Sequence, residues 1–151
     1  MHARRKIAVA GATGRVGRHV VDMLKARRHD VVAMSRSSGV DVVTGDGLAE
    51  ALAGVEYVID VASGPSPDQE TATGFFTAAA RNLHGAGERA GVRRMIVVSI
   101  IGCDRFTAGY NAAKVATSGP CCRAPSRYVY CARRSSTSSS RSSWSGAGRA
   151  R

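Results

Sequence analysis

The amino-acid sequence predicts one doubly wound α/β domain, a parallel sheet of about five strands with helices on both faces. Strand-like and helix-like stretches alternate through short connections. The strand-like stretches are continuous apolar runs, which is typical of parallel strands buried on both faces. The first of them leads directly into a glycine-rich turn that opens a helix. We expect this domain to occupy residues 1–116.

The first half of this domain contains three predicted strands. Residues 6–10 form a short buried strand, and apolar residues recur at helical spacing over 14–27. The apolar stretches 30–35 and 40–46 predict the second and third strands. A short helix then covers 47–54, and the glycine that ends it occupies the usual position of a helix C-cap.

The second half continues the alternation. Residues 55–63 predict a fourth strand, and the Ala-rich stretch 68–91 predicts a long helix that is closed by a glycine. Residues 92–100 predict a fifth strand, and "AGYNAAKVA" at 108–116 begins another helix. Gly-Pro follows this helix closely, and no hydrophobic period resumes after it.

The turn "GATGRVG" has the glycine spacing of a dinucleotide-binding loop. Gly11 permits a tight turn, Gly14 lets backbone N–H groups approach a pyrophosphate, and Gly17 lets the helix pack closely on the strand. Glycine-rich turns also occur for purely steric reasons, but here a strand precedes the turn and a helix follows it. We therefore expect the helix N-terminus to bind phosphate. The predicted loop consists of Gly11, Ala12, Thr13, Gly14, Arg15, Val16 and Gly17.

The end of the second strand indicates which dinucleotide is preferred. An acidic residue there commonly binds the ribose 2′-hydroxyl of NAD, whereas this strand ends with Ser35 and Arg36. A guanidinium pairs well with the 2′-phosphate of NADP, so we expect NADP(H), with NAD(H) as a second option. The alternative is that Arg36 is a solvated loop residue. Asp46, at the end of the predicted third strand, could contact the adenine or cap the next helix.

Three further residues form a candidate proton-transfer set. Tyr110 and Lys114 are four residues apart on a predicted helix and therefore share one face, and Ser99 ends the fifth strand. An ammonium near a phenol favours the phenolate, so the tyrosine could exchange a proton with a carbonyl or alcohol. The serine hydroxyl could hydrogen-bond the substrate oxygen. The alternative is that these are exposed surface residues without a catalytic role, as a helical tyrosine near a lysine most often is.

With these motifs the chain resembles the short-chain dehydrogenase/reductase superfamily, in its atypical, NmrA-like NAD(P)H-binding branch. The resemblance covers residues 6–116 and rests on "GATGRVG", "SRSS", "TGD", "VIDVAS", "VVSIIG" and "YNAAK". It implies a Rossmann-type fold, a cofactor site that includes Ala62 and Ser63, and reduction of a small carbonyl- or quinone-like substrate. It also implies that Ser99, Tyr110 and Lys114 are catalytic. Some members of the branch only sense the cofactor, so a non-catalytic NADP-binding redox regulator with a protein partner is the alternative.

The net charge of +11 does not predict nucleic-acid binding. Residues 117–151 supply seven Arg and no acidic residue, which leaves residues 1–116 with a net charge of only +4. Adjacent Cys121 and Cys122, with no clustered His, do not make a metal site. No apolar run has the length of a membrane span, and the basic start leads directly into a strand. We expect a cytoplasmic protein without membrane or nucleic-acid partners.

Residues 117–151 are rich in Ser and Arg, and we expect them to be disordered and to form no strand. A flexible linker and a nucleic-acid arm are two interpretations. A third is a frameshift. With one extra nucleotide before codon 117, one permitted choice of codons reads "HERAVL", then "PGP", then "VPVRVLRAAQF". That reading continues the helix, turns, and supplies a buried strand, so we expect the domain to be truncated and the Ser/Arg segment to be out of frame.

Overall fold

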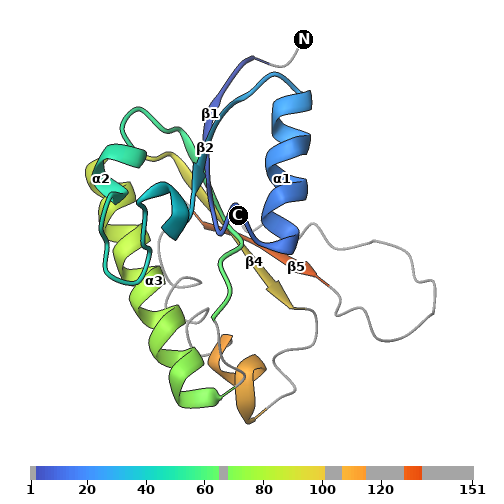
Figure 1. The fold of residues 1–151 in the computed structure, drawn as a ribbon, viewed down its shortest axis with the longest axis vertical. Coiled ribbons are helices and arrows are strands. Elements are labelled where there is room, and N and C mark those ends of the chain that lie inside the picture. Colours follow the sequence, from blue (N-terminus) through green and yellow to red (C-terminus); the bar gives the residue numbers. More distant parts are fainter. Residues whose placement is uncertain (1–2, 65–67, 101–106, 115–127, 134–151) are drawn as a thin grey trace, which may run out of the picture.

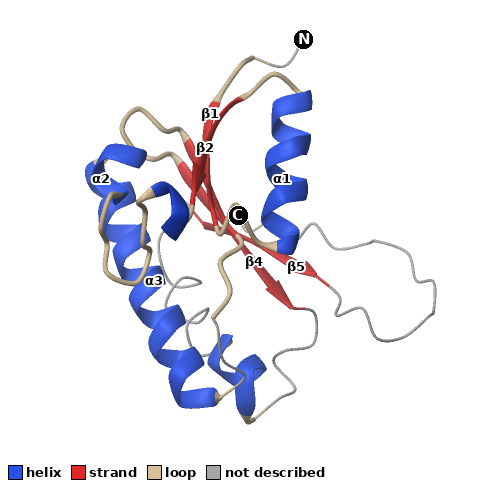
Figure 2. Cartoon of the chain, viewed as in Figure 1, coloured by secondary structure: helices blue, strands red, loops and turns tan. Residues whose placement is uncertain are grey.

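The computed structural model describes residues 3–64, 68–100, 107–114 and 128–133 as a parallel sheet with helices on both faces (Figure 1). The sheet order is β2-β1-β3-β4-β5. Helix α1 (Arg15–Ala26) covers one face, and α2 (Leu48–Ala51) and α3 (Gln69–Arg89) cover the other (Figure 2). The predicted doubly wound α/β fold is confirmed. The strands are β1 (Lys6–Ala10), β2 (Asp30–Met34), β3 (Tyr57–Asp60), β4 (Arg94–Ile100) and β5 (Tyr128–Arg133).

The core forms one apolar layer on each face of the sheet. Val9 and Val21 join the sheet to α1. The larger layer joins it to α2 and α3 through fully buried side chains such as Leu52, Val58 and Leu83. Because both faces are covered, the strands carry the continuous apolar sequence from which they were predicted. No helix in the described ranges is long and apolar enough to cross a membrane.

The predicted strand over residues 40–46 is wrong, because these residues form a looped connection instead. The carboxylate of Asp41 accepts a hydrogen bond from the Val43 N–H at 2.7 Å, which folds the chain back on itself. The Asn82 side chain on α3 donates to the carbonyl oxygens of Val42 and Val43, at 3.1 and 2.6 Å. These side-chain bonds replace the ladder that a strand would have made.

The prediction that no strand forms after residue 117 is also wrong. Strand β5 pairs in parallel with β4 from Met95 opposite Tyr128 to Ile100 opposite Arg133. Its sequence begins Tyr-Val-Tyr, residue types with high strand propensity, and it satisfies backbone groups that the edge of β4 would otherwise leave unpaired. The remaining residues of the segment 117–151 lie outside the described ranges.

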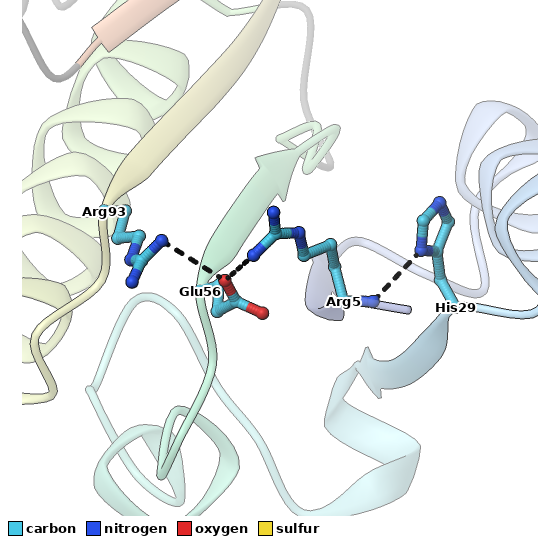
Figure 3. A network of polar contacts seen from close by, with 4 residues as sticks. All are labelled: Arg5, His29, Glu56 and Arg93. Atoms are coloured by element: carbon cyan, nitrogen blue, oxygen red, sulfur yellow. Dashed lines mark hydrogen bonds and ion pairs between the residues drawn. The ribbon is translucent and has the colours of Figure 1, made fainter. Parts of the chain in front are cut away.

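Ion pairs connect the amino ends of the strands (Figure 3). Glu56, before β3, binds Arg5 at 2.8 Å and lies 3.7 Å from the Arg93 guanidinium. The Arg5 backbone N–H donates to His29 Nδ1, just before β2, at 3.3 Å. These groups are partly exposed, so each pair contributes about 0.5 kcal/mol. The network lies at the end of the sheet opposite the carboxyl ends of the strands.

Candidate functional site

The turn after β1 brings three chain segments together at Gly11. The N–H groups of Gly11 and Ala12 both donate to the Met34 carbonyl oxygen at the end of β2, at 3.1 and 3.2 Å. Gly11 has a φ of +76°, and a Cβ added there would lie 2.8 Å from the Ala62 backbone beyond β3. A side chain is therefore excluded both by the backbone conformation and by the space available.

The other two glycines allow close backbone contacts in the same turn. A Cβ on Gly17 would lie 2.1 Å from the Gly11 carbonyl oxygen, and one on Gly14 would lie 3.2 Å from the same atom. Gly14 is the N-cap of α1, with no side-chain cap bond, and the first turn of the helix contains no acidic residue. The first N–H groups of α1 are thus open to an anion, as binding of a pyrophosphate requires.

The remaining predicted loop residues lie in the same turn. The Arg18 side chain donates to the Thr13 carbonyl oxygen at 2.8 Å, which fixes the outer part of the loop. Ala12 is buried, whereas Thr13 and Arg15 are exposed and Val16 is half-buried. Ala62 and Ser63 follow directly after β3, on the other side of the Gly11 contact.

The segment after β2 exposes the guanidinium of Arg36. Ser35 caps a short 3₁₀ helix, η1 (Arg36–Ser38), and its N–H donates to Ser38 Oγ at 2.9 Å. Arg36 is exposed, and no carboxylate in the described part of the chain forms an ion pair with it. The 2′-phosphate contact of Arg36 stays a prediction.

Asp46 does not cap the helix that follows it. The N-cap of α2 is Gly47, which makes no side-chain cap bond, whereas the Asp46 carboxylate accepts from Thr44 Oγ1 at 2.7 Å. Gly47 approaches the turn after β2 so closely that a Cβ there would lie 2.4 Å from the Gly39 carbonyl oxygen. The loop that carries Asp46 and the turn that follows η1 are therefore in contact. A contact of Asp46 with adenine remains a prediction.

The predicted proton-transfer residues lie at the carboxyl end of the sheet. Ser99, near the end of β4, is buried, and so is Lys114 on the helical residues 109–114. The Lys114 Nζ lies 4.3 Å from the centroid of the Phe76 ring, and the Tyr110 ring meets the same ring edge-on at 5.2 Å. Phe76 on α3 thus brings Tyr110 and Lys114 together.

The environment of Tyr110 raises its pKa, which is opposite to the expected effect of a neighbouring ammonium. Burial is the main cause, and the negative charge of Asp60 adds to it. A hydrogen bond from the Gly64 backbone acts in the lowering direction. In this arrangement the phenol, and not the phenolate, is the favoured form at neutral pH.

Sequence reasoning missed Asp60, the last residue of β3. Its side chain is buried, and Oδ1 accepts a hydrogen bond from the Ala62 N–H at 2.9 Å. Burial raises the pKa of Asp60, while the charges of Lys114 and His84 and the Ala62 hydrogen bond act against that rise. An acidic residue within the apolar stretch "VIDVAS" was the signal available in the sequence. Within the described residues, no three His, Cys, Asp or Glu side chains are grouped as a metal site would require.

A family model described as NAD(P)H-binding matches residues 11–124, which is most of the chain. The chain therefore belongs to the NAD(P)H-binding family, in agreement with its resemblance to the atypical short-chain dehydrogenases/reductases. The expectation of a dinucleotide cofactor is confirmed by this membership. No curated protein matches the sequence.

Solved structures share the fold at low sequence identity. A GDP-mannoheptose C4 reductase from Campylobacter jejuni with NADP bound has a TM-score of 0.73 and 16% identity, covering 89% of this chain and 52% of that chain. A dTDP-4-dehydrorhamnose reductase from Bacillus anthracis in complex with NADP has a TM-score of 0.67 and 18% identity, covering 86% and 53%. A putative NAD-dependent epimerase/dehydratase from Bacillus halodurans has a TM-score of 0.72 and 22% identity, covering 86% and 70%. The chain spans about half the length of the two reductases.

We expect the variant Gly17→Ala to lose NADPH binding and stability. Alanine is favoured over glycine within a helix by about 1 kcal/mol, but here the added Cβ would overlap backbone atoms, which cannot rotate away. We expect a net destabilisation on the order of 1–3 kcal/mol. Urea unfolding and NADPH titration measure the two effects.

The matched control is Gly74→Ala on α3, where an added Cβ meets no atom within 4 Å. This control should bind NADPH normally and gain up to about 1 kcal/mol of stability. A Gly17→Ala variant that unfolds and binds as the wild type does would contradict the close packing of α1 on the turn.

Proposed function

We propose that the chain binds NADP(H) and reduces a small carbonyl- or quinone-like substrate, with Ser99, Tyr110 and Lys114 as the proton-transfer residues. The observation that carries this proposal is the meeting of Tyr110 and Lys114 on the Phe76 ring. The helical residues 109–114, which carry both, lie at the end of the sheet where the glycine-rich turn opens α1 (Figure 1). Open parallel α/β sheets bind their ligands outside the carboxyl ends of the strands, in the crevice at the point where the strand order reverses. Here that point lies between β1 and β3.

Each of these residues would have a distinct role in binding or proton transfer. The first N–H groups of α1 hold the pyrophosphate, and Arg36 pairs with the 2′-phosphate. The bound reduced nicotinamide supplies the hydride. Ser99 hydrogen-bonds the substrate oxygen, and Tyr110 donates the proton that this oxygen takes up. A raised pKa keeps Tyr110 protonated at neutral pH, which is the form that donates in the reducing direction.

A non-catalytic NADP-binding redox sensor is the second candidate. It is favoured by the position of the Lys114 ammonium, which lies over Phe76, and by the raised pKa of Tyr110, which makes the phenol a weaker proton donor. A panel of NADPH oxidation assays distinguishes the two candidates. The panel would contain a quinone, an aldehyde and a nucleotide-linked 4-keto sugar, the last because two similar structures are sugar-nucleotide reductases. Binding without turnover, together with a co-purifying protein, would favour the sensor.

We expect wild-type protein to bind NADPH more tightly than NADH, and Arg36→Ala to lose that preference. A charge-assisted contact to the 2′-phosphate contributes on the order of 1–3 kcal/mol, or about tenfold to a hundredfold in affinity. Calorimetric titration of both cofactors measures this difference. Arg81→Ala, which removes an exposed arginine from α3, is the control and should keep the preference. Equal affinities of the wild type for both cofactors would refute the assignment.

We expect Tyr110→Phe to lose about 10²-fold or more in turnover while its NADPH affinity stays nearly unchanged, because the phenol acts on the substrate oxygen. Lys114→Ala should impair both turnover and binding, since the ammonium could also reach the nicotinamide ribose. Initial rates and NADPH titrations separate the two effects. Tyr57→Phe removes the same hydroxyl at the amino end of β3 and should turn over normally. A fully active Tyr110→Phe variant would exclude the proposed proton donor.

We infer, as a separate point, that the chain is read out of frame from codon 117. The inference rests on the codon choice given above, under which codons 128–133 would read "VRVLRA" in the shifted frame; the pairing of β5 with β4 by the residues of the present sequence counts against it. We expect that one nucleotide restored before codon 117 raises the unfolding temperature and makes activity appear or increase. Sequencing of the gene and thermal unfolding of the restored chain provide the test. A gene without a continuing reading frame at that point would refute the inference.

A further inference from the structure

The side chain of Asn82 joins helix α3 to the connection between η1 and α2 (Figure 1). Its amide nitrogen donates to two successive carbonyl oxygens, that of Val42 at 3.1 Å and that of Val43 at 2.6 Å. The next residue, Leu83, is fully buried in the larger core layer, so the core holds this part of α3 in place. The amide therefore attaches the connection to a firmly packed helix.

The connection folds into a closed loop that carries Asp46. The Asp41 N–H donates to the Asp46 carbonyl oxygen at 3.0 Å, and the Gly45 N–H donates to the Asp41 carbonyl oxygen at 2.8 Å. The Thr44 hydroxyl donates to the Asp46 carboxylate at 2.7 Å. Because the two carbonyl groups held by Asn82 immediately precede Thr44, a short series of hydrogen bonds connects α3 to the Asp46 carboxylate.

The loop that carries Asp46 lies beside the candidate cofactor residues that follow β2. A Cβ on Gly47 would lie 2.4 Å from the carbonyl oxygen of Gly39, which is the C-cap of η1. The same short helix begins with Arg36, the residue expected at the 2′-phosphate. Asp46 is exposed, and a carboxylate bound by one hydroxyl keeps further acceptor positions. It can therefore accept a hydrogen bond from the amino group of an adenine bound next to Arg36.

We propose that Asn82 is a positioning residue for adenine recognition, because its two hydrogen bonds hold the loop so that the Asp46 carboxylate faces the adenine amino group. The proposal rests on the proposed binding of NADP(H), and it adds selection for an amino-substituted purine at that site. An apolar side chain in place of Asn82 leaves the two carbonyl oxygens without these donors, so the loop opens more easily. Asn82 acts through Asp46 and need not touch the cofactor.

The first test compares NADPH with its hypoxanthine analogue, in which an oxygen replaces the adenine amino group. A hydrogen bond to a charged group should give the wild type about a tenfold preference for NADPH. In Asn82→Leu the affinity for NADPH should fall, and the preference should shrink to about twofold or less. Asp46→Ala should lose the preference to the same extent, and the double variant no further, because both substitutions act on one contact. Calorimetric titration of the full chain measures each affinity.

The second test needs no cofactor, because it follows amide hydrogen exchange of the loop by NMR. In Asn82→Leu the N–H groups of Asp41 and Gly45 should exchange about threefold or more faster, since the loop opens more easily. The Gly14 N–H, which donates to the Gly11 carbonyl oxygen in the glycine-rich turn, should keep its rate. If the leucine variant does not fold, Asn82→Ala replaces it in both tests, because alanine is the best helix former.

Gln69→Leu is the matched control, because it removes another amide of α3 that is bonded to a distant backbone group, the Gly109 N–H at 2.8 Å. It should keep both the adenine preference and the exchange rates of the loop. Equal weakening of NADPH and its analogue in Asn82→Leu would overturn the proposal, as would unchanged loop exchange or a wild type that binds both dinucleotides equally well. A wild type that binds neither would refute the proposed function and with it the adenine contact, whereas the exchange test would still decide whether Asn82 holds the loop.

Discussion

The close contact of backbone with backbone at Gly11 is the constraint on which the rest of the site depends. The backbone of Gly11 contacts three elements: the end of β2 at the Met34 carbonyl, the segment after β3 at Ala62, and the first turn of α1 at Gly17. Contacts between main-chain atoms cannot be relieved by a change of rotamer, so they restrict the conformations open to the turn. That rigidity aims the first N–H groups of α1 at the place where a pyrophosphate would bind.

The two ends of the sheet carry different kinds of contact. At the amino ends, Glu56 pairs with Arg5 and Arg93, and these exposed pairs contribute little individually but tie neighbouring strands together (Figure 3). At the carboxyl ends the strands lead into turns whose backbone groups and buried charges face the candidate site. The stabilising surface contacts and the candidate chemistry therefore occupy opposite ends of the same strands.

The features that the sequence predicted well are those set by local geometry. Gly11 has a positive φ and Gly17 packs on the nearby backbone of Gly11 and Ala12, so their spacing was informative. The loop over 40–46 was missed because Asn82, some forty residues later, competes for its carbonyl oxygens. Asp60 was missed for a similar reason, since Lys114 and His84, whose charges act on it, lie on helical segments distant in the chain. Apolar patterning indicates which apolar residues are buried, but it does not indicate which charged side chains are buried among them.

Asp60 works against stability at neutral pH. A folded-state pKa raised above the unfolded value means that the folded chain holds the proton more tightly, so this group's contribution to stability is present at low pH. That contribution is lost as the pH rises through the folded-state pKa. An apolar side chain of similar size would serve the core better, because a carboxylate loses its hydration on burial. The negative charge of Asp60 acts electrostatically on Lys114 and Tyr110, and it does not strengthen the fold at neutral pH.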